Sequence, residues 1–252
     1  MKLPRLPQLA LGLASLFVLC LPAHSQFLRV GFSGSIAIDK LETMNDTLQI
    51  ADPASRLDLL KRLGIDASVA EAATSHRFPH DIEIQPIHKD SGKSYGIVSL
   101  PCGVQNQAFL YLLHEDDHNK WHAVDYVALD CFHETPSYHL MSFSPGEDDI
   151  FVHHAHSGHG SGELEDKSTL YTIRNNRLHE TLSTPDYISR ADTSNSAPIE
   201  QTSTFLQLPG HLIEETRITS QNGLPLRAER RLWNWQTKQQ IFSKNLFHDI
   251  PK

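Results

Sequence analysis

The chain has 252 residues, with 22 Lys and Arg against 30 Asp and Glu, and its formal net charge is −8 at pH 7. An acidic excess of this size argues against the clustered basic face that nucleic acids require, so we expect no nucleic-acid partner. The same balance disfavours docking on an anionic membrane and favours solubility.

The amino terminus has the three parts of a secretory signal peptide. Lys2 and Arg5 supply positive charge, an apolar run covers residues 9–21, and Ala23-His24-Ser25 is a small-x-small cleavage motif. The apolar run is shorter than the roughly 20 residues that a membrane span needs. We therefore expect cleavage before Gln26, export to the periplasm or the exterior, and no membrane-spanning segment.

The clearest helical signals follow soon after this leader. Residues 27–38 are expected to be extended and to lead into a polar segment. Asp52-Pro53 then has the pattern of a helix N-cap and first turn, with leucines at helical spacing until Gly64. Asp66 is placed to cap a second short helix. We expect these two helices to form one hairpin packed on a sheet.

From Ile82 onward the pattern is that of strands separated by turns. The pairs Asn175-Asn176 and Asn222-Gly223 predict tight hairpin turns, because both residue types tolerate positive φ. The segment 192–204 is rich in Ser, Thr, Asn and Pro and is expected to be an exposed loop. Strands are expected at residues 95–100, 108–113, 121–129, 139–143, 150–156, 168–174, 177–182, 212–219, 226–235 and 239–243.

The expected fold is mainly β. It is an antiparallel sandwich, barrel or curled sheet of about 9–11 strands, with a small helical hairpin near the amino terminus. We expect a signal peptide at residues 1–25 and a single β-rich soluble domain over residues 26–252. No repeat is strict enough to indicate a propeller.

Two cysteines remain after the leader, Cys102 and Cys131. An even pair in an oxidising compartment predicts a disulfide, with two buried free thiols as the alternative. If residues 95–131 form a three-stranded meander, the strands that carry the two cysteines lie about 9.5 Å apart. That exceeds the usual bridging limit of roughly 7 Å between Cα atoms. The loop after Cys102 must therefore bend over the middle strand.

The segment from His114 to His118 matches the pattern His-Glu-x-x-His, in which two His bind zinc and Glu acts as a general base. That chemistry requires a helix. Here the segment joins two expected strands and contains two adjacent Asp, which are hard to bury. We favour a hairpin turn without catalytic function. His122 extends the four-residue spacing and keeps a zinc hydrolase at His114, Glu115 and His118 as an alternative.

A second histidine cluster holds His154, His156 and His159. On a strand the first two project from the same face, and the flanking glycines give His159 the freedom to fold back. Neutral imidazole suits Zn²⁺ and Cu²⁺. No cofactor is otherwise expected, so any metal site is predicted here. With 16 His in the chain, solvated histidines without function remain the simpler interpretation.

Two indoles lie on one face of an expected strand. Trp233 and Trp235 share that face with Arg227, Glu229 and Arg231, and aromatic rings beside polar groups suit a sugar ring. The interpretation we favour is that both indoles cover the edge of the core, with the Arg stems packed alongside.

The remaining motifs indicate no chemistry. The acidic run Glu147-Asp148-Asp149 lacks the calcium-loop pattern and is expected to be solvated in a turn. The spacings around Ser35 and Gly160 fit neither a nucleophile elbow nor a dinucleotide loop. We therefore expect a non-catalytic envelope or secreted protein that binds or scaffolds a partner, with a glycan or a protein as its ligand. A metal-dependent protein is the competing class.

Overall fold

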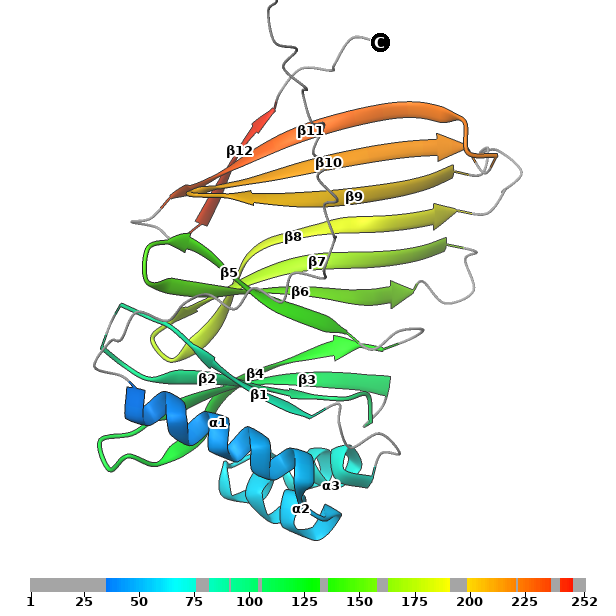
Figure 1. Cartoon of the computed structure of the whole chain (residues 1–252). Coiled ribbons are helices and arrows are strands. Elements are labelled where there is room, and N and C mark those ends of the chain that lie inside the picture. Colours follow the sequence, from blue (N-terminus) through cyan, green and yellow to red (C-terminus); the bar gives the residue numbers. More distant parts are fainter. Residues whose placement is uncertain are drawn as a thin grey trace, which may run out of the picture. The chain divides into compact units, whose positions relative to one another are not determined.

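The computed structural model describes residues 35–75, 82–90, 92–103, 106–131, 136–157, 163–190, 199–220, 222–236 and 241–246. These residues form three helices followed by twelve strands, so the fold is mainly β as expected (Figure 1). The strands make two antiparallel sheets, of four and of eight strands. The expected signal peptide and its cleavage site lie outside the described residues.

The first helix, α1 (Ser35–Ile50), replaces the end of the predicted extended stretch and the polar segment after it. That prediction was wrong. Leu41, Met44 and Leu48 recur at helical spacing, and the two leucines are fully buried against the helical side of the core. The apolar stripe is narrow, about one residue per turn, which is why the segment resembled an irregular polar one.

The two predicted helices are confirmed as α2 (Pro53–Arg62) and α3 (Ala67–Ser75). The carboxylate of Asp52 accepts hydrogen bonds from the backbone N–H groups of Ala54 and Ser55, at 2.9 and 3.1 Å. Gly64 follows α2 with a φ of +80°, which an L side chain rarely adopts. Asp66 caps α3 in the same way as Asp52 caps α2, through the N–H of Ser68 at 2.8 Å.

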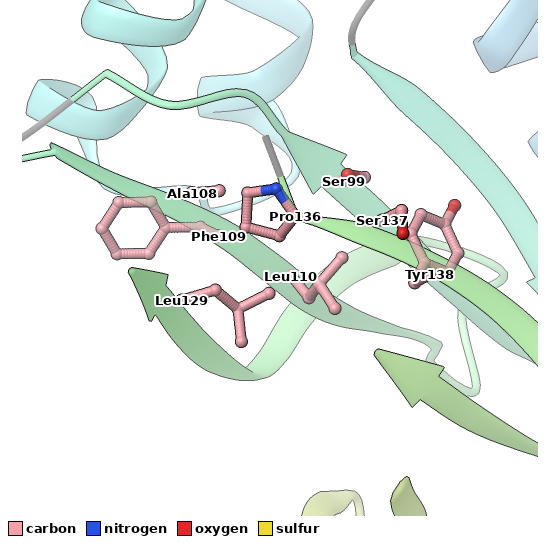
Figure 2. Close-up of a pocket in the computed structure, with 8 residues that line it drawn as sticks. All are labelled: Ser99, Ala108, Phe109, Leu110, Leu129, Pro136, Ser137 and Tyr138. Atoms are coloured by element: carbon pink, nitrogen blue, oxygen red, sulfur yellow. The ribbon is translucent and has the colours of Figure 1, made fainter. Parts of the chain in front are cut away.

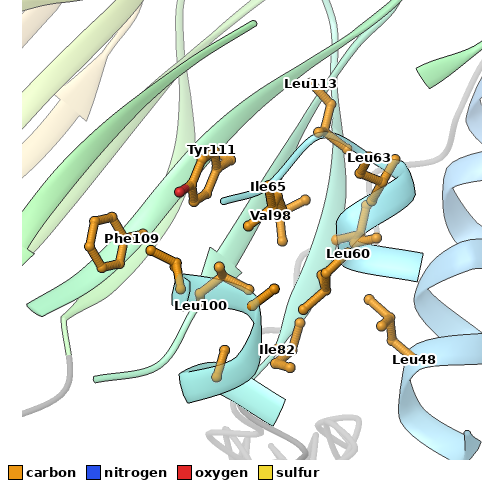
Figure 3. Packing of buried hydrophobic residues seen from close by; sticks show 14 of the residues in the cluster. Leu48, Leu60, Leu63, Ile65, Ile82, Val98, Leu100, Phe109, Tyr111 and Leu113 are labelled. Carbon is orange, nitrogen blue, oxygen red and sulfur yellow. The ribbon is translucent and has the colours of Figure 1, made fainter. Parts of the chain in front are cut away.

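The four-stranded sheet is a meander in chain order. Its strands are β1 (Glu83–Ile87), β2 (Tyr95–Leu100), β3 (Gln107–Glu115) and β4 (Trp121–Asp130). The helices pack on one face of this sheet and form a buried cluster with side chains of β1, β2 and β3 (Figure 3). Members of that cluster are Leu48, Leu60, Leu63, Ile65, Ile82, Val98, Leu100, Phe109, Tyr111 and Leu113.

Helix α1 also satisfies backbone groups at the free edge of β1. The side-chain oxygen of Asn45 accepts a hydrogen bond from the N–H of Ile84 at 2.8 Å. The side-chain amide of Gln49 donates to the carbonyl of Ile82 at 2.9 Å. An edge strand otherwise presents unpaired backbone groups that can pair with another chain. The helix therefore protects this edge.

The eight-stranded sheet is a second meander, and its spatial order also follows the chain from β5 to β12. In the part of the chain described, β5 and β12 do not pair, so the sheet is open and no barrel closes. Its strands are β5 (Ser137–Ser144), β6 (Glu147–Ser157), β7 (Glu163–Arg174), β8 (Arg177–Arg190), β9 (Ile199–Leu208), β10 (His211–Ser220), β11 (Pro225–Gln236) and β12 (Ile241–Leu246).

Ten of the strands match predicted ranges; β1 and β9 have none, although β1 lies in the part of the chain where strands were expected. Strand β9 covers the end of the segment 192–204, which was expected to be a loop; residues 192–198 lie outside the described part. The hydroxyl of Ser203, the buried residue of β9, bonds that of Thr216 at 2.9 Å, so β9 places a polar side chain inside the fold. A strand of this kind has the composition of a loop. The Asn175-Asn176 turn is confirmed, with φ of 50° and 60°.

The two faces of the eight-stranded sheet differ. We call the face that carries Phe151, Leu170 and Leu212 the inner face, and the opposite face the outer face. On the outer face, Ile150, Val152 and Ile173 pack against the four-stranded sheet. On the inner face the sheet curls, because Phe151 of β6 meets Phe205 of β9 with ring centroids 5.2 Å apart.

The loop after β1 joins the two sheets at the beginning of β6. Lys89 lies 3.4 Å from the carboxylate of Asp149, which is 1% exposed, and the N–H of His88 donates to Asp148 at 2.9 Å. The expectation that the run Glu147-Asp148-Asp149 is solvated was therefore wrong for Asp149. The β1–β2 loop crosses over this run, and sequence alone did not indicate that contact.

Candidate functional site

The segment from His114 to His118 is the end of β3 followed by a turn, as the hairpin interpretation predicted. The carboxylate of Asp116 accepts hydrogen bonds from the N–H groups of His118 and Lys120, both at 2.9 Å. Asn119 has a positive φ of 56°. The segment is not a helix, so His114 and His118 do not share the helix face that the zinc-protease pattern requires.

The second predicted cluster is described only in part. His154 lies half-buried on the outer face of β6, and its backbone pairs with Lys167. The side chain of His156 and all of His159 lie outside the described residues. Within the described ranges, no three His, Cys, Asp or Glu side chains are grouped to hold a metal ion. The metal site at these three histidines stays a prediction.

The cysteine pair is joined. Cys102 and Cys131 form a disulfide, with their Cα atoms 6.0 Å apart. Because β3 lies between β2 and β4 in the sheet, this short distance shows that the chain at Cys102 bends over the start of β3. This bend is the one that the spacing of the strands demanded. The bridge ties the loop after β2 to the end of β4 and has a structural role.

A shallow depression lies between the four-stranded sheet and the beginning of β5 (Figure 2). Its walls are mainly apolar, with Ser99 and Ser137 as the polar residues. The residues that line it are Ser99, Ala108, Phe109, Leu110, Leu129, Pro136, Ser137 and Tyr138. These side chains bring together no acid, base or charged group, so the depression suggests no chemistry.

The inner face of the eight-stranded sheet contains a buried carboxylate. Glu214 of β10 is fully buried, and its Oε1 accepts hydrogen bonds from Thr184 at 3.1 Å and from Thr216 at 3.3 Å. Arg231 of β11 donates to the same oxygen at 3.0 Å, and the indole N–H of Trp233 donates to Oε2 at 3.0 Å. Four donors therefore use both oxygens of this carboxylate.

Two further charged groups extend the cluster toward solvent. Arg231 also donates to Glu229 at 3.0 Å, and Arg227 lies 2.7 Å from the other oxygen of Glu229. The side chains of Arg231 and Glu229 are 23% and 19% exposed, whereas Arg227 is 60% exposed. Burial thus decreases from Glu214 outward. We call Glu214, Arg227, Glu229, Arg231 and Trp233 the Glu214 cluster.

The two tryptophans of β11 have different environments. Trp235 is buried in the apolar core of the inner face, and its indole N–H donates to the hydroxyl of Ser144 at 2.9 Å. Trp233 is only partly buried, at the boundary between this apolar core and the Glu214 cluster. The expectation that the indoles cover the core is confirmed for Trp235. Trp233 also packs against this core, although it is only partly buried.

A second polar group lies on the inner face, across β6, β7 and β8. Asp186 accepts hydrogen bonds from the ring of His153 at 2.5 Å and from the hydroxyl of Ser168. Serine, histidine and aspartate are the residues of a catalytic triad, but here the aspartate stands between the other two. In a triad the histidine must contact the serine hydroxyl to remove its proton. This arrangement therefore orients His153 and does not activate Ser168.

Glu214 and Asp186 were not predicted from the sequence. One signal was available for the first of them: Glu214 and Glu215 are adjacent on a strand, and successive side chains point to opposite faces. One of the two must therefore face the core side of the sheet. Asp186 follows Pro185 at an irregularity in the β7–β8 pairing, where alternation is interrupted. No comparable signal marks it in the sequence.

Comparison with protein families, with curated proteins and with solved structures finds no match for this chain. Among the residues described, no helix is both long and apolar enough to cross a membrane.

Proposed function

We propose that the protein is an exported, non-catalytic binding protein, and that it holds a carbohydrate against the inner face of its eight-stranded sheet. The observation that carries this proposal is the fully buried carboxylate of Glu214, which fixes both Arg231 and Trp233. Ligand-contacting side chains that are locked by buried hydrogen bonds lose little entropy when a ligand binds.

The chemistry of the Glu214 cluster favours a neutral, hydroxyl-rich ligand. Arg227 and Arg231 are both paired with carboxylates, so the cluster does not present an excess of charge to attract an ion. Guanidinium groups donate hydrogen bonds and Glu229 accepts them, which matches the mixed character of sugar hydroxyls. The partly accessible ring of Trp233 offers an apolar face on which a sugar ring can stack.

Binding without hydrolysis follows from how Glu214 is used. Glycosidases need two carboxyl groups that flank the bond to be cleaved, one of them able to donate a proton to the leaving oxygen. Here Glu214 is fully buried, and both of its oxygens are occupied by donors from the protein. Of the two carboxylates in the Glu214 cluster, Glu229 is the more accessible, with its side chain 19% exposed. We therefore expect a bound oligosaccharide to be recovered intact.

The proposal is tested by screening the mature protein against an array of glycans and repeating the screen with Trp233→Ala. Arg217→Ala is the matched control, because Arg217 also belongs to a carboxylate ion pair but lies on the outer face of the same sheet. We expect glycan binding that is lost in Trp233→Ala and kept in Arg217→Ala. Equal binding by all three proteins would show that the ligand sits elsewhere.

A further inference from the structure

His114 and His122 are direct cross-strand partners of β3 and β4, next to the turn that joins these strands. Their ring centroids lie 6.3 Å apart, and both side chains are half-buried. We propose that this pair chelates a divalent transition-metal ion of the kind that imidazole suits, such as Cu²⁺ or Zn²⁺, with water at the remaining positions. This site is independent of carbohydrate binding.

The ring of His114 is already oriented as a ligand. Its Nδ1 lies 3.0 Å from the carbonyl oxygen of Ser94, and a carbonyl can only accept a hydrogen bond. Nδ1 therefore carries the proton, and Nε2 presents its lone pair. Metal-binding histidines are commonly held by such a bond from the second ring nitrogen. The ring also stacks on Tyr95, with centroids 5.0 Å apart, which further restricts its orientation.

The separation of the two rings fits one ion between them. A metal–nitrogen bond is about 2.0–2.1 Å long, so two nitrogens on the same ion are at most about 4 Å apart. Ring nitrogens lie on the rim of each imidazole and can approach more closely than the centroids, which are 6.3 Å apart. The proposed chelate requires the His122 ring to turn one nitrogen toward Nε2 of His114, which is a change in side-chain torsions only.

The turn beside the pair favours a cation. The carboxylate of Asp116 is held in the turn by the backbone N–H groups of His118 and Lys120, both at 2.9 Å. The side chains of His118 and His122 interact electrostatically with it. Glu115, the residue after His114, is paired with Lys40 at 3.2 Å.

This chelate differs from the zinc-protease pattern in its second ligand. His118 is four residues after His114, but it lies in the turn and its backbone N–H is bonded to Asp116. His122 is the residue that the hairpin register places opposite His114. His118 and His122 therefore have different expected roles, and His118 provides a matched control for His122.

The test is calorimetric titration of the mature protein with Cu²⁺ alone. A His154→Ala, His156→Ala variant serves as the parent, so that the other histidine cluster does not contribute. In this parent, His122→Ala and His114→Gln are each expected to weaken Cu²⁺ binding at least about tenfold, since even outer-shell partners are worth that much. His118→Ala is expected to leave the affinity unchanged.

Paramagnetic broadening by Cu²⁺ in amide NMR spectra of the same parent locates the ion without any change in the hairpin. We expect the signals of residues 113–115 and 121–123 to broaden first. Broadening centred elsewhere, or no Cu²⁺ binding by the parent, overturns the proposal even if a hairpin variant fails to fold. So does an equal loss of affinity in His118→Ala and His122→Ala.

Discussion

Lys89 lies 3.4 Å from Oδ1 of Asp149, and this buried ion pair connects the loop after β1 with the first residues of β6. The side chains of Lys89 and Asp149 are 5% and 1% exposed. The neighbouring backbone contact, in which Asp148 N–H donates to the His88 carbonyl at 2.8 Å, joins the same two segments. The packing of the two sheets thus depends on a charged contact as well as on apolar side chains.

The first prediction concerns this ion pair. Lys89→Met leaves the Asp149 carboxylate buried without its partner, and breaking a buried pair in this way costs about 3–5 kcal/mol. Asp149→Asn should cost less, because it removes the buried charge and Lys89 keeps Glu147 at 3.7 Å. Urea unfolding of the three proteins measures both effects. A larger loss in Asp149→Asn than in Lys89→Met would contradict this account.

The second prediction is the pH dependence of the same contact. Burial raises the pKa of Asp149 above its ordinary value of 3.8, although Lys89 opposes the shift. The folded state then holds the proton more tightly than the unfolded state. The stability that Asp149 contributes is complete below pH 3.8 and is lost as the pH rises through the raised pKa. The unfolding free energy of wild type minus that of Asp149→Asn should therefore fall as the pH rises through the raised pKa. A difference that does not change with pH would refute this prediction.

The third prediction concerns Glu214. In Glu214→Ala, the guanidinium of Arg231 loses its buried partner and the indole N–H of Trp233 loses its acceptor, at a cost of about 3–5 kcal/mol. Glu214→Gln retains an acceptor and should be milder. Glu215→Gln is the control, since Glu215 pairs with Arg217 and Arg230 on the outer face of the same sheet. Denaturant unfolding should show the largest loss of stability in Glu214→Ala, a smaller loss in Glu214→Gln and the smallest in Glu215→Gln.

The fourth prediction concerns the disulfide. Exported protein should contain no free thiol at Cys102 or Cys131 when it is titrated under denaturing, non-reducing conditions. Replacing both with Ser should lower the free energy of unfolding by roughly 3–4 kcal/mol, because the bridge reduces the conformational entropy of the unfolded chain. Two reactive thiols in the exported protein would show that the bridge does not form in the cell.

The fifth prediction concerns the leader. The intact mass of the exported protein should correspond to a chain that begins at Gln26, because Ala23-His24-Ser25 has the small-x-small pattern that signal peptidases cut. A full-length mass, or a lipid attached to Cys20, would show that the amino terminus is processed differently.

Local signals predicted much of the fold. Asp52 and Asp66 cap their helices because a carboxylate next to free backbone N–H groups stabilises a helix start wherever the helix packs. Asn175 and Asn176 likewise adopt positive φ for reasons internal to the turn. These features depend on neighbours in the chain, so the sequence displays them directly.

The features that escaped prediction depend on distant partners. Asp149 is buried because a loop 60 residues earlier covers it, and β9 is a strand because its backbone pairs with β8 and β10. His114 pairs with His122 because of the register of the hairpin. That register depends on the turn and on which side chains are buried, so the number of residues between the two histidines does not predict it. The four donors to the carboxylate of Glu214 come from β8, β10 and β11, and only the folded sheet brings them together.

The most direct test of carbohydrate binding is a titration of tryptophan fluorescence. The mature protein is titrated with the oligosaccharide that binds best on the array, next to the variants Trp233→Phe and Trp121→Phe. Trp121 is buried against the helices, in the cluster on the other side of the four-stranded sheet. We predict a saturable change in emission that disappears in Trp233→Phe and persists in Trp121→Phe. An undiminished change in Trp233→Phe, or no oligosaccharide that binds the wild type, would contradict the proposed function.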